Sequence, residues 1–426
     1  MDLEGLARVL DEETARGLIG TLLRIYKGDN PLVPRLVETV IEEVRNSRKA
    51  ESYHPLLRVE KVGAKAGESG LGSRGFGDHL IHSYVLKMSG GLFEDAGIVD
   101  DLVVSVDGIH SRLSYFPFFA GFHATRAALR DVAVKGAKPL GVLVDIHLAD
   151  DADLSYLFEF EAGVLAVVKA LNVRVLAGST LRIGGDMVIG ERISGGVGAV
   201  GKLVTRAFLR TNAKKGQHLV MTEGRGGGTI TATAIFNGVP EVALRTITLS
   251  DVITAVRVSE SLSDKVTAMT DVTNGGIRAD AVEISSSTGL SVVLDTERFL
   301  KLIDPVVAKM LEALNVDPLG LSIDSILMAT DNPDDLINAL KSFGVRSDVV
   351  GQLEEWKGSP LIDVSGRSLD YPFRESAYTP IKKVIGNYTP LSRQELEDRV
   401  AKAYELAMRK LKTVLKTLKV DEPLKG

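Results

Sequence analysis

Three aspartates lie beside glycines in the first third of the chain. Asp78 closes the stretch SRGFGD, Asp107 lies in VSVDGIH, and Asp131 lies in LRDVAVKGAKPL. Mg²⁺ takes oxygen ligands and binds proteins through one or two carboxylates together with substrate phosphates. Glycines let backbone N–H groups approach phosphate oxygens closely. The pattern therefore predicts a site for a cation that carries phosphates.

Each of these patterns also has a purely structural explanation. An Asp-Gly pair, as at Asp107, is a common turn former. The glycine-rich residues 62–78 could be a flexible linker. Alternatively, they form a loop that covers phosphates and leads into a strand with the sequence LIHSYVLKM, at residues 80–88. The residues alone leave both readings open.

The second half of the chain repeats this arrangement. DVTNGG, at residues 271–276, follows a predicted strand, and Thr273 and Asn274 can donate hydrogen bonds to a phosphate or a substrate. EGRGGGT, at residues 223–229, places glycines at a predicted helix start, where an anion can bind. It lacks the Lys-Ser/Thr ending of a Walker loop, so by itself it is a weak motif.

Other chemistries are disfavoured. The chain has no cysteine and no Gly-x-Ser-x-Gly, which excludes thiolate chemistry and gives no sign of a serine nucleophile. A histidine–metal site would use imidazoles from the first unit together with Asp107 and Asp145. The five histidines of that unit are His79, His82, His110, His123 and His147. His79 and His82 are three apart in a predicted strand, which would point them to opposite faces.

Composition limits the partners. Of 426 residues, 45% are hydrophobic and 25% charged, and the net charge is -5. An acidic chain lacks the basic footprint that nucleic acid needs, so we expect no nucleic-acid partner. No apolar run approaches the roughly 20 residues that span a bilayer, and we expect no membrane partner. The acidic amphipathic start is unlike a leader, which favours the cytoplasm.

Strands and helices alternate from residue 101, which is typical of the α/β class. In the first unit we expect strands at 101–107, 140–148 and 173–178 and helices at 121–135 and 153–171. In the second unit we expect strands at 217–224, 265–272, 290–295, 325–330 and 347–353, and helices at 277–288, 305–314 and 333–343.

Helical periodicity marks both ends of the chain. Residues 1–60 form a predicted helical extension, and a long C-terminal helix starts after Leu391 with Ser392 and Glu395 as a capping box. Four lysines, Lys410, Lys412, Lys416 and Lys419, suit the C-terminal end of that helix. The predicted division is 1–60, 61–204, 205–385 and 386–426.

Several of these motifs resemble the AIR synthase-like superfamily. LRDVAVKGAKPLGVLVDIHL is similar to its N-D-hydrophobic-x-x-x-G-A-x-P-L helix-to-strand motif, and VSVDGIH to its aspartate-glycine strand end. VLAGSTLRI resembles its G-G-[DE]-T turn, and DVTNGGIRAD resembles D-[VPS]-[TS]-x-G-G-[LI]. The likeness covers about residues 65–357 and leaves out both terminal helical segments.

The resemblance implies two α/β domains. The N-terminal half-barrels would pair into a β-barrel across a homodimer, and the C-terminal domain would be an α/β sandwich. ATP and Mg²⁺ would bind in the groove at that interface. The resemblance assigns catalysis to Asp107, Asp131, Asp271 and Asn274, nucleotide binding to Gly75, Gly77, Asp78, Asp107, Gly108, Asp131, Ser179 and Thr180, and metal binding to Asp78, Asp107 and Asp131.

Departures from the family pattern leave the chemistry open. Ser179 replaces the acidic residue of G-G-[DE]-T, and Arg130 replaces the asparagine before Asp131. We expect an ATP- and Mg²⁺-dependent ligase or kinase that phosphorylates an amide or carbonyl oxygen, or a phosphate, of a small molecule. The alternative is a nucleotide-binding scaffold or regulator with degraded catalysis.

Overall fold

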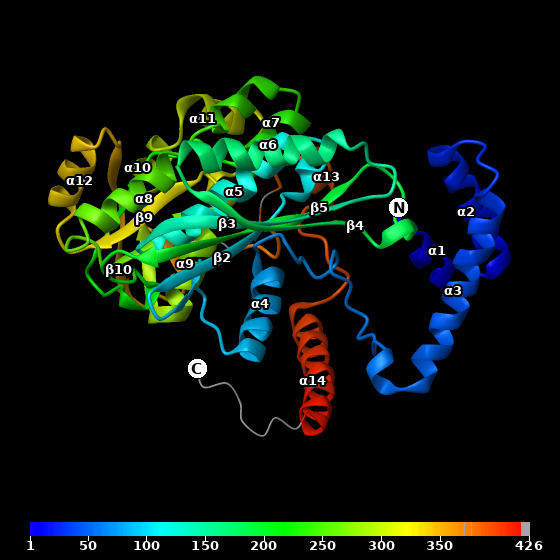
Figure 1. The fold of residues 1–426 in the computed structure, drawn as a ribbon. Coiled ribbons are helices and arrows are strands. Elements are labelled where there is room, and N and C mark those ends of the chain that lie inside the picture. The colour runs from blue at the N-terminus through cyan, green and yellow to red at the C-terminus, as the bar shows by residue number, and fades with distance from the viewer. Residues whose placement is uncertain (370, 376, 419–426) are drawn as a thin grey trace.

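Two mixed β-sheets carry the fold (Figure 1). The structure is a computed structural model that describes residues 1–369, 371–375 and 377–418. The first sheet has the order β1-β2-β5-β3-β4 and consists of β1 (Gly97–Val99), β2 (Leu102–Gly108), β3 (Ala137–Leu148), β4 (Arg174–Arg182) and β5 (Ile193–Leu203). The second sheet has the order β11-β8-β10-β6-β9-β7 and consists of β6 (His218–Thr222), β7 (Ala268–Val272), β8 (Leu290–Leu294), β9 (Ser325–Thr330), β10 (Ser347–Glu355) and β11 (Leu361–Asp363).

Helices accompany each sheet, so the predicted α/β class with two domains is confirmed. The first domain contributes α5 (Pro117–Val134) and α6 (Ser155–Ala170). The second contributes α7 (Gly228–Phe236), α8 (Ser250–Ser261), α9 (Gly276–Thr288), α10 (Thr296–Lys301), α11 (Pro305–Ala313) and α12 (Pro333–Ser342). Within the described residues neither sheet closes into a barrel, so a barrel across two copies stays a prediction.

Helix α5 lies between the two domains. It contacts β2, β3 and β5 of the first sheet, and also β7, α7 and α8 of the second domain. Its small residues allow this crowding: a Cβ added to Gly121 would lie 2.1 Å from the Phe160 carbonyl oxygen of α6. The predicted end of α5 is confirmed, because Gly136 follows with a positive φ of 90°. Asp131 consequently lies in the last turn of a buried helix.

The predicted strand at residues 80–88 is wrong. These residues belong to α4 (Phe76–Ser89), which ends at Gly90 in the left-handed conformation. The glycine-rich segment therefore leads into a helix. His79 and His82 lie on one side of that helix, one turn apart, instead of on opposite faces of a strand.

Both terminal helical segments are present. α1 (Leu3–Val9), α2 (Glu12–Lys27) and α3 (Val33–Tyr53) pack around an apolar cluster of their own, which also includes Ile189. The C-terminal helix α14 (Arg393–Thr417) has the predicted capping box and packs against α4 (Figure 1). Lys419 lies outside the described residues. Of the helices that the structure describes, none has the length and apolar character to cross a bilayer.

Two buried arginines of α5 join the domains. Arg126 and Arg130 lie one helical turn apart and point at carboxylates of the second domain. Arg126 Nε donates to both oxygens of Asp251 at 3.0 Å. Arg130 Nη1 donates to Asp251 at 2.9 Å and to Asp324 at 2.7 Å, and Arg130 Nε donates to Asp271. Although burial opposes ionisation, Arg130 and Arg126 hold the pKa of Asp324 at about 2.

Removing Arg130 leaves these carboxylates under-compensated in a buried site. We expect Arg130→Met to lower the free energy of unfolding by about 3–5 kcal/mol, because breaking a buried pair strands its partners. The matched control is Lys138→Met, which breaks an exposed interdomain pair with Glu260 and should cost less than about 1 kcal/mol. Urea unfolding followed by circular dichroism measures both values. Equal losses in the two variants would contradict the role of the buried network.

Candidate functional site

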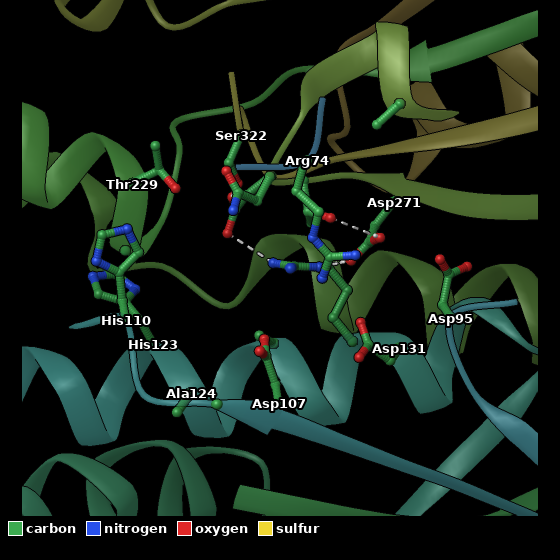
Figure 2. A pocket seen from close by; sticks show the side chains of 18 of the residues that line it. Arg74, Asp95, Asp107, His110, His123, Ala124, Asp131, Thr229, Asp271 and Ser322 are labelled. Carbon is green, nitrogen blue, oxygen red and sulfur yellow. Dashed lines mark hydrogen bonds and ion pairs between the residues drawn. The ribbon is translucent and has the colours of Figure 1, made fainter. Parts of the chain in front are cut away.

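A cavity of about 420 Å³ lies where α5 and β2 meet the second domain (Figure 2). Its described lining carries more acidic than basic side chains. The carboxylates are Glu94, Asp95, Asp107, Asp131, Asp271, Asp280, Glu283 and Asp324. The lysine and arginine side chains are Arg74, Arg130, Arg210 and Lys382. Because the acidic side chains would repel a phosphate, we expect an anionic ligand to bind here together with a cation such as Mg²⁺.

Asp107 and Asp131 have no ion-pair partner among the described residues. Asp107 comes from the end of β2 and Asp131 from α5, and both carboxylates face the cavity (Figure 2). Ser105 Oγ donates to Asp131 at 2.7 Å, but neither carboxylate has an ion pair among the described residues. Burial raises the pKa of Asp131, and the nearby carboxylates of Asp271 and Asp107 raise it further. A bound cation would relieve this repulsion.

The residues fit Mg²⁺ only if phosphate completes its coordination. Across the described chain, no group of three or more His, Asp or Glu side chains is arranged to hold a metal ion. Mg²⁺ typically keeps waters and binds through one or two carboxylates plus substrate phosphates, instead of through an all-protein cage. Asp107 and Asp131 can provide that pair.

Asp78 is not brought together with these two aspartates. Its side chain is fully buried and does not line the cavity. Its carboxylate accepts the backbone N–H of Gly72 at 2.7 Å and of Arg74 at 3.1 Å. Arg74 has a positive φ of 59°, which is unusual for a residue with a side chain, and lines the cavity. In this structure Asp78 therefore positions the loop that presents Arg74.

Gly75 and Gly77 also lie outside the cavity lining. A Cβ on Gly75 would lie 2.5 Å from the Phe373 carbonyl oxygen, and one on Gly77 would lie 2.3 Å from that of Ser69. Gly77 N–H donates to Phe373 O at 3.3 Å. Their glycine identity is thus explained by close packing against a C-terminal segment and within the loop itself.

The strand residues assigned to the nucleotide separate into two groups. Gly108 lines the cavity at the end of β2, where it pairs with Gly196 of β5. Ser179 and Thr180 belong to β4, an exposed edge strand, and neither lines the cavity. The replacement of an acidic residue by Ser179 therefore does not change the charge of the cavity within this chain.

The turn after β7 does reach the cavity. Asp271, Thr273 and Asn274 all line it. Burial raises the pKa of Asp271 to about 6, although the Arg130 guanidinium opposes this rise. Gly276 begins α9 with a positive φ of 60°, and a Cβ there would lie 2.2 Å from the Leu319 carbonyl oxygen. Because a side chain would clash there, the turn needs a second glycine at this position.

Several lining residues escaped the sequence reasoning. Glu94 and Asp95 precede β1 and pair with buried Lys135 at 2.7 and 2.8 Å. Arg210 pairs with Asp95 and, at 2.8 Å, with Glu283. The sequence signal that could have identified Glu94 and Asp95 as site residues is that two acidic residues stand side by side just before a strand. Tyr378 and Lys382 also line the cavity and come from beyond the stretch that resembled a family.

Comparisons with known proteins support the resemblance. The model of the AIR synthase related protein N-terminal domain matches residues 93–203, and that of the C-terminal domain matches residues 214–363. Asp78 therefore precedes the matched region, and Glu94 and Asp95 lie at its start. Together the two matches cover more than half of the chain.

Individual relatives extend this finding. An uncharacterized protein of Methanocaldococcus jannaschii is 40% identical and covers 98% of both chains, so its match includes the terminal helical segments. The thiamine-monophosphate kinase of Methanopyrus kandleri is 26% identical over 57% of this chain and 74% of its own length. The structure titled AaThiL complexed with AMPPCP and TMP has a TM-score of 0.57 at 17% identity, covering 73% of this chain and 98% of that one, which shows a common fold. The chain belongs to the AIR synthase-related family.

Proposed function

We propose that the protein is an ATP- and Mg²⁺-dependent enzyme that transfers a phosphoryl group to a small-molecule acceptor. The observation that carries this proposal is a pair of buried carboxylates, Asp107 and Asp131, that have no ion pair among the described residues and share one cavity with Arg74. Carboxylates that repel each other next to an arginine suit a metal-bound phosphate, in which Mg²⁺ meets the carboxylates and Arg74 meets phosphate oxygens. The relatives support ATP as the donor, since one is a kinase and the related ThiL structure contains AMPPCP, an ATP analogue.

The proposed roles follow the placement of the side chains. Asp107 and Asp131 would hold Mg²⁺, which when bound neutralises charge on the phosphates. Arg74 and the loop around Gly72 would cover those phosphates. Thr273 and Asn274 would face the acceptor. Catalysis would rest on positioning and charge neutralisation, as is general for phosphoryl transfer. Asp78, Gly75 and Gly77 would act through the loop conformation instead of through direct ligand contact.

Binding of the ATP analogue AMPPNP tests the metal pair without a known acceptor. We expect Mg²⁺ to strengthen binding to the wild-type protein by about tenfold or more, relative to binding in EDTA. Asp107→Asn should lose most of this gain, because the amide removes a charge from the metal pair. Asp101→Asn is the matched control, since Asp101 is exposed, precedes the same strand and pairs with Lys202. Isothermal titration calorimetry gives each affinity.

A gain that persists in Asp107→Asn, or the absence of nucleotide binding in the wild type, would contradict the proposal. ADP release with panels of amides, carbonyl compounds and phosphate esters then separates ligase from kinase chemistry. Tight binding without turnover of any acceptor would favour the alternative, a scaffold with degraded catalysis.

We also propose that two copies pair through the first sheet, in the proposed domain 61–204. Helices α5 and α6 cover one face of this sheet, and the opposite face exposes Val104, Leu143 and Val106 at 41%, 41% and 78%. An apolar sheet face of this kind commonly marks an interface. Val106 directly precedes Asp107 on β2, so a second copy on this face would lie against the strand that carries Asp107.

Charge on the open face should prevent this pairing. We expect the wild-type protein to be a dimer and Leu143→Asp to be largely monomeric, because the substitution buries a carboxylate in an apolar interface. The control is Leu154→Asp, since Leu154 is 69% exposed at the start of α6 on the helix-covered side. Sedimentation equilibrium measures both masses. A monomeric wild type, or a dimeric Leu143→Asp, would contradict the dimer.

A further inference from the structure

We infer that the C-terminal segment, residues 371–375 and 377–385, supplies Lys382 as a residue that binds an oxyanion, a phosphate or a carboxylate, of the acceptor substrate. This inference rests on the proposed phosphoryl transfer and names the chemical class of its acceptor. The segment follows the region that matches the family domains, which ends at residue 363. It is therefore a feature of this chain and not of the matched domains.

The segment is held against both the glycine-rich loop and the second domain. Phe76 N–H donates to Pro372 O at 3.0 Å, and Tyr371 Oη donates to Arg74 O at 3.1 Å. Asn237 Nδ2 donates to Tyr378 O at 2.9 Å from the end of α7. Tyr378 is 1% exposed. The short helix α13 (Pro380–Ile385) begins immediately afterwards and carries Lys382 into the cavity lining.

A chain of hydrogen bonds links Lys382, Tyr378 and His110 at this end of the cavity. Lys382 Nζ donates to Tyr378 Oη at 2.9 Å, and Tyr378 Oη and His110 Nε2 share a hydrogen bond, also of 2.9 Å. Burial lowers the pKa of His110 to about 3, and the imidazole is neutral. His110 Nδ1 is buried and has no hydrogen-bond partner among the described residues. It is thus a polar atom that a polar group of a ligand can satisfy.

Lys382 lacks a compensating carboxylate. None of the described Asp and Glu side chains lies within ion-pair distance of its ammonium group. Burial, together with the nearby cations Arg112 and Arg374, lowers the pKa of Lys382 to about 8. Tyr378 contacts the ammonium group directly, and its ring lies 4.1 Å away. A half-buried ammonium group near other cations is stabilised by an incoming anion.

The N-terminus of α7 lies at this end of the cavity, as does the carboxylate of Asp324, which pairs with Arg130 and lies 2.2 Å from where a Cβ on Gly227 would be. Gly228 and Thr229 of the α7 N-terminus line this end, and a Cβ on Gly228 would lie 3.3 Å from His110 Cβ. The unpaired N–H groups at a helix N-terminus carry partial positive charge, so they attract an anion as the ammonium group of Lys382 does. Figure 2 shows His110 and Thr229 on one side of the cavity, Asp131 on the other and Asp107 between them. The acceptor anion would thus lie on the side of Asp107 that faces away from Asp131.

Inorganic phosphate and acetate serve as probes of this site. The full chain is first saturated with Mg²⁺ and AMPPNP, and its affinity for each anion is measured by isothermal titration calorimetry at constant ionic strength. We expect Lys382→Met to weaken anion binding by about tenfold or more. Lys382→Arg should restore binding, and Lys383→Met on the same helix should leave it unchanged, since Lys383 is exposed, contacts Leu314 O and does not line the cavity. A preference for phosphate indicates a phosphomonoester acceptor, and a preference for acetate a carboxylic acid.

The pH dependence provides a second measurement that needs no loss-of-charge variant. Phosphate affinity of the wild type should fall as the pH rises above about 8, where free Lys382 loses its proton. In Lys382→Arg it should stay constant, because arginine remains charged. The inference is overturned if the wild type binds neither anion, or if Lys382→Met binds as tightly as wild type. Failure of AMPPNP itself to bind would instead count against the proposed function.

Discussion

The arrangement of the site depends on the buried ion network around Arg126 and Arg130. A guanidinium without partners in the protein interior is very costly, so the two arginines of α5 require carboxylates from the second domain. Asp251, Asp271 and Asp324 meet this requirement from three separate elements. The network therefore fixes how the two sheets lie relative to each other. It also fixes Asp131, because that residue directly follows Arg130 on the same buried helix.

This constraint divides the carboxylates of the cavity into two classes. Asp95, Asp271 and Asp324 have arginine or lysine partners within the chain and contribute to the domain contact. Asp107 and Asp131 have no ion-pair partner among the described residues; the more distant Arg130, and for Asp107 also Arg74, offset their charge only in part, and burial raises the pKa of both. Lys382 is the reverse case, a cation with no carboxylate at ion-pair distance among the described residues. This distribution of charged side chains fits two ligands side by side, a nucleotide that brings a metal cation to Asp107 and Asp131 and an acceptor that brings an anion to Lys382.

Local signals in the sequence predicted much of the fold and part of the site. Helix α5 was recognisable because its apolar periodicity ends at Gly136, and the strand ends at Asp107 and Asp271 were recognisable because glycines follow them. Helix α4 was misassigned because its apolar residues fit either period, although glycines at its N-cap, Gly75, and C-cap, Gly90, bracket it. Asp78 was assigned to metal from its type and neighbours, whereas its role in the loop depends on which backbone groups surround it.

Residues defined by distant partners could not be predicted. Asp95 depends on Lys135 and Arg210, which lie 40 and more residues away in the chain. Lys382 becomes a cavity residue only because the C-terminal segment returns to the glycine-rich loop. No periodicity or short motif records such contacts, since they follow from the packing of complete domains.

A crystal structure of the complex with AMPPNP and Mn²⁺ tests the central claim most directly, because the anomalous signal of Mn²⁺ locates the metal without ambiguity. We predict an anomalous peak bonded to the carboxylates of Asp107 and Asp131 and to phosphate oxygens of the nucleotide. A peak bonded to neither of these two aspartates, or a nucleotide bound outside this cavity, would contradict the account.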